Sequence, residues 1–170
     1  LAVGQPNPFI PTEVHVISTA VGCNFVRLNL LAKDTDHFSK LQRDYRLPAV
    51  HFDETCLHVI RNSLGEPVDD IRSPEDNTAA ADALTSLISE LTRDDESAVH
   101  VSIAGGRKTM VFYGGYALSL YGRQQDRLSH VLVSAEFENL RSFFYPSPEP
   151  RTIYDKDERA QRLEVALLAA

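Results

Sequence analysis

The sequence predicts an α/β fold with a mostly parallel sheet, and three observations support this prediction. Short β-branched segments alternate along the chain with apolar segments of helical period. No internal repeat or linker interrupts the 170 residues, which is roughly the length of one domain. Hydrophobic residues make up 43% and charged residues 24%, a composition typical of globular proteins. We therefore expect a single domain over residues 1–170 with one packed core.

The first part of the chain is expected to hold short strands around a broken helix. A β-branched run at 14–17 follows a turn and reads as a strand. Apolar residues recur with a loosely helical period over 22–45, and the polar residues 33–36 predict a break in that helix. Short strands are expected at 49–52 and 57–60, with turns between and after them.

The clearest helix start lies in the middle of the chain. Ser73 is a good N-cap, Pro74 suits the first helical position, and acidic residues follow in the first turn. One apolar stripe then runs to Leu91. The remaining expected elements are a strand at 98–104, a helix at 110–121 that is buried nearly all round, strands at 128–134 and 151–154, and a helix at 158–168.

Charge and composition exclude several functions. The net charge of −7 opposes non-specific capture of nucleic acid, so double-stranded DNA is not an expected partner. No apolar run is long enough to cross a membrane and no signal-type segment is recognised, which favours a cytoplasmic protein without a membrane partner. The two cysteines and six histidines show no metal-ligand spacing, so neither a metal site nor a cofactor is expected. An acidic group around Arg72 is interpreted as capping of the following helix rather than as a cation site.

The segment from strand to helix at 102–109 has the composition of an anion site. Its adjacent glycines permit a tight turn and close approach of a ligand to the backbone. The helix start that follows offers unpaired N–H groups and a positive dipole end, next to two cations and a hydroxyl. A phosphate is the most natural ligand for these groups. The residues expected to bind it are Ser102, Gly105, Gly106, Arg107, Lys108 and Thr109.

Two familiar nucleotide loops are excluded by the spacing of these glycines. A Walker A loop needs four residues between its glycines, and a dinucleotide fingerprint needs Gly-x-Gly-x-x-Gly. The alternative is a tight turn with two exposed basic residues and no ligand. Ser18 and Thr19 end another expected strand, so they belong to the same sheet edge as Lys108. The aromatic run 143–145 is open to two interpretations: it stacks on bases, or it anchors a loop or an interface.

With these residues in view, the chain resembles a known family. The segment from His100 to Met110, His-Val-Ser-Ile-Ala-Gly-Gly-Arg-Lys-Thr-Met, looks like the signature of the CRISPR-associated Rossmann-fold (CARF) proteins, and it is most similar to their small ring nucleases. The resemblance covers about residues 5–150. Further matching segments lie at 11–19, 52–54, 69–77, 116–123, 125–134 and 143–146.

This resemblance implies a Rossmann-like three-layer sandwich and a homodimer that binds cyclic oligoadenylate, a second messenger of CRISPR defence. Ring nucleases cleave that ring and switch off type III CRISPR signalling; cyclic tetra-adenylate is the expected ring. The phosphate-binding role falls on Gly105, Gly106, Arg107 and Lys108, with Ser102 and Thr109 beside them. The family usually begins with one further strand, a loop and a helix, and this chain is expected to start near the end of that helix.

The resemblance leads to a hypothesis of metal-independent RNA cleavage. A ribose 2′-OH in line with the adjacent phosphate displaces the 5′-oxygen and leaves a 2′,3′-cyclic phosphate, so the protein mainly positions groups and stabilises charge. Lys108 is the expected catalytic donor, and Ser18 or Thr19 would orient the ribose or phosphate. Two alternatives remain open. The pocket is a sensor that binds the ring without cutting it, or the chain is a Rossmann enzyme for an ordinary nucleotide.

Overall fold

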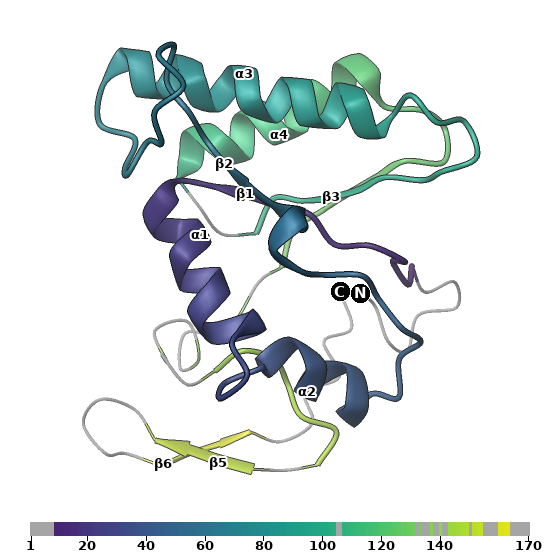
Figure 1. Cartoon of the computed structure of the whole chain (residues 1–170). Helices are drawn as coiled ribbons and strands as arrows, with labels where there is room; N and C mark the ends of the chain where they lie inside the picture. The colour runs from purple at the N-terminus through teal and green to yellow at the C-terminus, as the bar shows by residue number, and fades with distance from the viewer. Residues whose placement is uncertain are drawn as a thin grey trace. The chain divides into compact units, whose positions relative to one another are not determined.

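The computed structural model describes residues 9–104, 107–131, 133, 137, 140, 143–149, 151–154 and 160–163 (Figure 1), with side chains left out at 151, 154 and 160–163. The chain forms two compact units. The first unit comprises residues 1–15, 26–56 and 133–170, and the second comprises residues 16–25 and 57–132. Among the residues that the structure describes, no helix is both long and apolar enough to cross a membrane.

The second unit contains two pairs of parallel strands. Strand β1 (Val16–Ser18) pairs with β2 (Leu57–Val59), and β3 (His100–Ser102) pairs with β4 (Arg127–Ser129). Parallel neighbours need a long crossover, which the helical segments between the paired strands provide. The prediction of an α/β fold with parallel strands is confirmed for these two pairs. Each strand is shorter than the segment that the sequence predicted for it.

Helix α3 (Pro74–Leu91) begins as its sequence predicts. The Ser73 side chain accepts the Asp76 N–H at 3.0 Å, and the Asp76 carboxylate accepts the Ser73 N–H at 3.0 Å, which completes a capping box. The apolar stripe faces inward, and its buried members are Ala80, Leu84 and Ile88. Ala80 joins a core cluster whose other buried members are Ile60, Val68 and Ile71.

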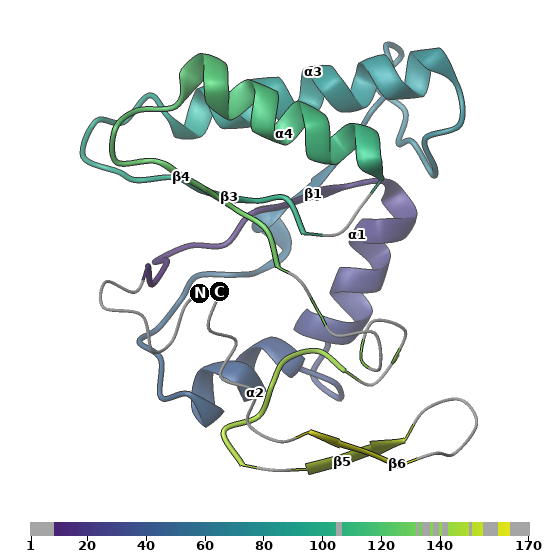
Figure 2. The same cartoon turned by 180° about the vertical axis from the view of Figure 1, so that it is seen from behind.

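Helix α4 (Lys108–Tyr121) runs alongside α3 (Figures 1 and 2). The prediction that α4 is buried nearly all round is wrong, because only Gly114 and Ala117 are buried along it. Phe112, Tyr116 and Leu120 are 64%, 52% and 56% exposed. Their spacing of four residues places them on one helix face. The apolar sequence therefore predicted the helix correctly. It did not predict that, among the described residues, no element covers one face of the helix.

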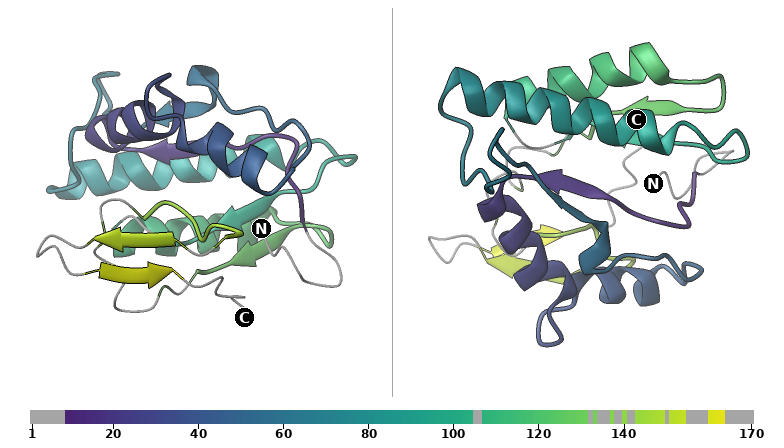
Figure 3. Two further views of the ribbon diagram at one scale, coloured as in Figure 1. Left: turned by 90° about the horizontal axis from the view of Figure 1, so that it is seen from below. Right: turned by 45° about the horizontal axis from the view of Figure 1, so that its top comes forward.

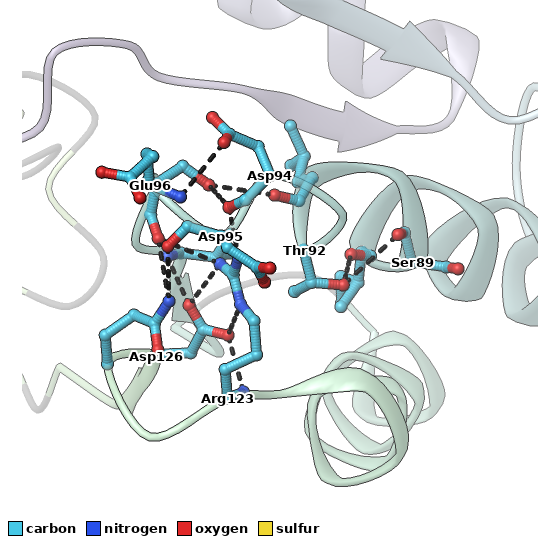
Figure 4. Close-up of polar contacts among 12 residues, drawn as sticks. Ser89, Thr92, Asp94, Asp95, Glu96, Arg123 and Asp126 are labelled. Carbon is cyan, nitrogen blue, oxygen red and sulfur yellow. Dashed lines mark hydrogen bonds and ion pairs between the residues drawn. The ribbon is translucent and has the colours of Figure 1, made fainter.

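The ends of α3 and α4 are tied together by a polar network (Figure 4). The Asp126 side chain is 1% exposed, and it accepts hydrogen bonds from Arg123 Nε and Nη2, both at 2.9 Å. The Val99 N–H also donates to Asp126, at 2.7 Å. Arg123 in turn donates to the carbonyl oxygens of Asp94 and Ser97, in the loop after α3. This network fixes the chain where it enters β3 and β4.

Helix α1 (Ala20–Val26) continues into the π-helical turn η1 (Arg27–Leu31), and helix α2 spans His37–Asp44. The predicted break at 33–36 is confirmed. Asp36 has φ 37°, in the left-handed region, and its side chain accepts the Ser39 N–H as the N-cap of α2. No strand forms over 49–52; a single parallel bridge joins Glu13 to His51, and the short 3₁₀ turn η2 (Glu54–Cys56) follows.

The C-terminal part of the first unit differs from its prediction. Strand β5 (Arg151–Tyr154) is confirmed, and it pairs antiparallel with β6 (Ala160–Leu163) (Figure 3). The helix expected at 158–168 is therefore wrong for 160–163, because these residues pair across a hairpin that their helical periodicity does not reveal. Residues 158–159 and 164–168 of that expected helix lie outside the described residues.

Candidate functional site

The candidate site is built around the carboxyl ends of β1 and β3 in the second unit. Thr19 follows β1, and its Oγ1 accepts the Gly22 N–H at 3.2 Å, so it caps the start of α1. Ser18 ends β1, and its hydroxyl lies directly over the same turn. A Cβ added at Gly22 would stand 2.1 Å from Ser18 Oγ, so the absence of a side chain at this position makes room for the hydroxyl.

The segment 68–72 links the end of β1 to the start of α4. The Val68 carbonyl accepts the Ala20 N–H at 2.8 Å, which places this segment beside the start of α1. Two residues further on, Asp70 Oδ1 accepts hydrogen bonds from Arg107 Nε at 2.9 Å and Nη2 at 2.5 Å. Asp70 Oδ2 accepts from Arg72 Nε at 2.8 Å. Figures 1 and 2 show the starts of α1 and α4 at the same end of this unit.

The two arginines make Asp70 a permanent anion at neutral pH. The Arg107 guanidinium, followed by that of Arg72, holds the pKa of Asp70 at about 2, below its ordinary value of 3.8. Asp70 therefore partly neutralises Arg107 and fixes its orientation. Arg107 is 54% exposed and uses Nε and Nη2 for this pair. Its Nη1 has no carboxylate partner among the described residues, so it is available to a phosphate.

The start of α4 presents the second cation and free backbone donors. Arg107 occupies the N-cap position with extended backbone angles, φ −74° and ψ 147°, and makes no side-chain cap hydrogen bond. Lys108 is the first residue of a 14-residue helix and is exposed, as is Thr109. Within the described part of the chain, the Lys108 ammonium makes no hydrogen bond or ion pair. The arrangement concentrates positive charge at a helix N-terminus, where anions bind.

The remaining predicted ligand-binding residues divide into two groups. Ser102 ends β3, is exposed, and lies opposite Ser129 of β4 in the parallel register. His100, two residues earlier, contacts Ser129 Oγ through Nε2 at 2.7 Å, and burial lowers its pKa, so it is neutral at pH 7. Gly105 and Gly106 lie outside the described residues.

The aromatic run 143–145 anchors a loop on α2. The Tyr145 hydroxyl donates to Asp44 Oδ2 at 2.8 Å, and the Tyr145 side chain is buried. The Tyr45 hydroxyl donates to the Pro146 carbonyl at 2.5 Å. Phe144 stacks on His37 with ring centroids 3.8 Å apart. These contacts favour the anchoring interpretation over base stacking, because the aromatic faces already have partners.

Sequence reasoning placed the cationic residues of the site but missed their carboxylate. It interpreted the acidic residues around Arg72 as helix caps, and Asp76 does have that role. Asp70 instead pairs with Arg107, which lies 37 positions later. The adjacent carboxylates Asp69 and Asp70 were the only sign of this pair in the sequence. Which cation they contact depends on how the chain packs, so the sequence alone did not identify Arg107. A second group of possible ligands, Glu13, His51 and Cys56, was also missed.

The comparisons with known proteins identify the family. No protein of curated function matches the sequence. The family model described as CRISPR-associated protein NE0113 matches residues 4–168, which is nearly the whole chain. The expected CRISPR association is thereby confirmed, while the ring nuclease assignment stays a proposal. On this match, the chain belongs to the CRISPR-associated protein NE0113 family.

Proposed function

We propose that this chain binds cyclic oligoadenylate and cleaves it to linear products ending in a 2′,3′-cyclic phosphate, so that type III CRISPR signalling is switched off. Cyclic tetra-adenylate is the proposed ring. The observation that carries this proposal is the cationic start of α4, with Lys108 exposed and unpaired among the described residues and Arg107 oriented by Asp70. Membership of a CRISPR-associated family supports the choice of a signalling nucleotide as the phosphate ligand.

The proposed reaction needs little covalent chemistry from the protein. The ribose 2′-oxygen forms a bond to the adjacent phosphorus, the bond from phosphorus to the 5′-oxygen breaks, and the 2′-OH proton is lost while the 5′-oxygen gains one. No water is added in this step. Holding the 2′-oxygen in line contributes roughly 7–11 kcal/mol in favourable cases. The Lys108 ammonium stabilises the negative charge that develops on the phosphate oxygens, an effect of roughly 3 kcal/mol for one aimed donor.

The other residues have supporting roles in this proposal. Arg107 and the start of α4 hold the phosphate, while Ser102 and Thr109 lie beside it. Ser18 is the better candidate than Thr19 for orienting the ribose, because Thr19 Oγ1 already accepts the Gly22 N–H. Gly105 and Gly106 keep the cradle role that the family resemblance implies.

The decisive variant is Lys108→Ala. Cleavage of labelled cyclic tetra-adenylate in EDTA is expected to fall roughly a hundred- to thousand-fold, while binding weakens about ten-fold or less. Lys33→Ala is a matched control, since Lys33 is another exposed lysine and lies outside this unit. Cleavage by the Lys108 variant at the rate of the wild-type chain would overturn the catalytic role. Loss of binding together with cleavage would assign Lys108 to the binding of the ring alone.

A homodimer with a Rossmann-like sandwich in each subunit completes the proposal. The apolar face of α4 supports a second copy as partner, because three large apolar side chains lie exposed on one side of the helix and such contiguous apolar surfaces often mark interfaces. Phe112 and Tyr116 form a flat part of it, with stacked rings 5.9 Å apart. Sedimentation of the Phe112→Glu variant tests this point: the dimer is expected to dissociate, and an unchanged oligomeric state would remove α4 from the interface.

A sensor that binds the ring without cutting it is the second candidate. One observation favours it: the Thr19 hydroxyl serves as a helix cap, which leaves one fewer group to orient the ribose. The two candidates differ in a single readout. A sensor binds cyclic tetra-adenylate tightly and returns it intact, whereas a ring nuclease returns linear products.

A further inference from the structure

We propose that Glu13, His51 and Cys56 form a Zn²⁺-binding site in the first unit, a site separate from the residues assigned to the ring. Their ligand atoms all lie within 4.8 Å of one another. The three residues come from two strand-like segments and one turn. A carboxylate, an imidazole and a thiol are the three donor types that Zn²⁺ combines in proteins.

The backbone brings Glu13 and His51 together. Residues Glu13 and His51 form an isolated parallel bridge. The Val14 N–H donates to the His51 carbonyl at 3.0 Å, and the His51 N–H donates to the Thr12 carbonyl at 2.8 Å. As a result, His51 Nδ1 lies 2.9 Å from Glu13 Oε1. Two donors are therefore held at one point by main-chain hydrogen bonds rather than by flexible side chains alone.

A tight turn delivers the thiol to the same point. Asp53 Oδ1 accepts the Thr55 N–H at 2.8 Å and the Thr55 hydroxyl at 2.6 Å, and this closes the turn that leads into η2. Cys56 is 1% exposed, and its Sγ lies 4.0 Å from His51 Nδ1. The side chains of Glu13 and His51 are 46% and 52% exposed. The thiol is thus the buried donor of the three. Because the other two donors are exposed, an ion can reach the group from solvent.

The His51 ring lies between two carboxylates, with one ring nitrogen facing each. Its Nε2 lies 3.0 Å from Asp53 Oδ2, and its Nδ1 faces Glu13. A protonated imidazole donates to both carboxylates, whereas a neutral imidazole carries one N–H and donates to only one of them. With that hydrogen donated to Asp53, the Nδ1 lone pair points toward Glu13 and Cys56. The Nδ1 lone pair and the Glu13 carboxylate repel each other unless a cation lies between them. With a cation bound there, Asp53 would be the carboxylate that accepts the other N–H, a partner that metal-bound histidines commonly have.

The donor separations of a tetrahedral zinc site follow from the zinc bond lengths. Zn–N, Zn–O and Zn–S distances of roughly 2.0–2.3 Å place tetrahedral donor pairs about 3.4–3.6 Å apart. The present separations of 2.9 Å for His51–Glu13 and 4.0 Å for His51–Cys56 differ from that range by about half an ångström. The Glu13 carboxylate and Cys56 Sγ lie within 4.8 Å of each other, so this pair closes by up to about 1 Å. His15 Nε2 lies 3.3 Å from the other Glu13 oxygen and steadies that carboxylate. A water fills the fourth position, as at other three-ligand zinc sites.

Metal binding by the full chain tests the proposal. The protein is stripped with a chelator, and Zn²⁺ is titrated against a competing metallochromic dye; one Zn²⁺ per chain is expected. Co²⁺ is then added to a second stripped sample, where a thiolate ligand gives a charge-transfer band in the near ultraviolet. Thermal unfolding with and without Zn²⁺ adds a third readout, because an ion that binds the native chain raises the melting temperature.

Two variants and one control test whether His51 and Cys56 are the ligands. His51→Gln changes an exposed side chain, and it is expected to weaken Zn²⁺ binding at least ten-fold without unfolding the chain. Cys56→Ser is expected to lose the Co²⁺ thiolate band. Cys23→Ser is the matched control, because Cys23 is also buried but contacts the Ser18 and His58 carbonyls instead. Sub-stoichiometric Zn²⁺, equal binding by His51→Gln, or a band that survives Cys56→Ser would each overturn the proposal.

Discussion

Replacing Asp126 with Asn removes the most buried carboxylate of the network that ties α3 to α4. In the native chain the carboxylate is 1% exposed and accepts four hydrogen bonds. Two come from the Arg123 guanidinium, one from the Arg123 N–H and one from the Val99 N–H. Asn retains one acceptor oxygen, but its NH₂ group faces donors at the other position, so at least one hydrogen bond is replaced by a repulsive contact.

The pKa of Asp126 sets the size of the expected loss. The Arg123 side chain, with the Val99 and Arg123 N–H groups, lowers this pKa from 3.8 to about 2. Such a shift corresponds to about 2 kcal/mol of native-state stability at neutral pH. Removing one partner of a buried ion pair costs roughly 3–5 kcal/mol when nothing replaces it. Because Asn keeps the shape of the side chain and one acceptor oxygen, we expect the free energy of unfolding to fall by about 2 kcal/mol. For a chain of this length the melting temperature should then fall by about 4–8 °C.

Urea unfolding at several pH values measures this effect. Because the folded pKa is lowered, the stabilisation is fully present above pH 4 and is lost as the pH falls toward 2. The gap between the wild-type chain and Asp126→Asn should therefore be largest near neutral pH and close in acid. Asp82→Asn is the control, since Asp82 is an exposed carboxylate on α3. A gap below about 0.5 kcal/mol at neutral pH, or one that does not change with pH, would refute the reasoning.

Two further substitutions test the candidate site. Gly22→Ala should lower the free energy of unfolding by roughly 1–3 kcal/mol, because the new Cβ would stand 2.1 Å from Ser18 Oγ. Gly115→Ala is its control, with ordinary contacts of 3.8 Å, and equal stability of the two variants would contradict the argument. Asp70→Asn should raise the affinity for cyclic tetra-adenylate several-fold at low salt, since it removes the negative charge beside Arg107, and the gain should shrink as salt rises. Weaker ring binding by this variant would mean that orienting Arg107 outweighs neutralising it.

Local signals in the sequence predicted local structure well. The Ser73–Pro74 start of α3, its buried stripe and the break before α2 all depend on residues within a few positions of one another. The order of strands and helices also predicted parallel pairing, because parallel neighbours need a long crossover and a helix between two strands usually provides one. Such features do not require knowledge of the packed chain.

Distant partners account for what sequence reasoning missed. The strand β6 depends on pairing with β5, and its own residues have a helical pattern. The Arg107–Asp70 pair joins residues 37 positions apart, and the Glu13–His51 contact joins residues 38 positions apart. The exposure of Phe112 on α4 likewise depends on which elements cover the helix, and periodicity alone gives no information on that point.

Incubating the full chain with labelled cyclic tetra-adenylate in EDTA, with products resolved over time, tests the central claim most directly. The proposed function predicts linear products that end in a 2′,3′-cyclic phosphate, formed by the wild-type chain and the Lys33→Ala control but not by Lys108→Ala. A ring that stays intact while it binds tightly would contradict the nuclease and leave the sensor. A chain that does not bind the ring at all would contradict both, whatever the outcome of the zinc titration.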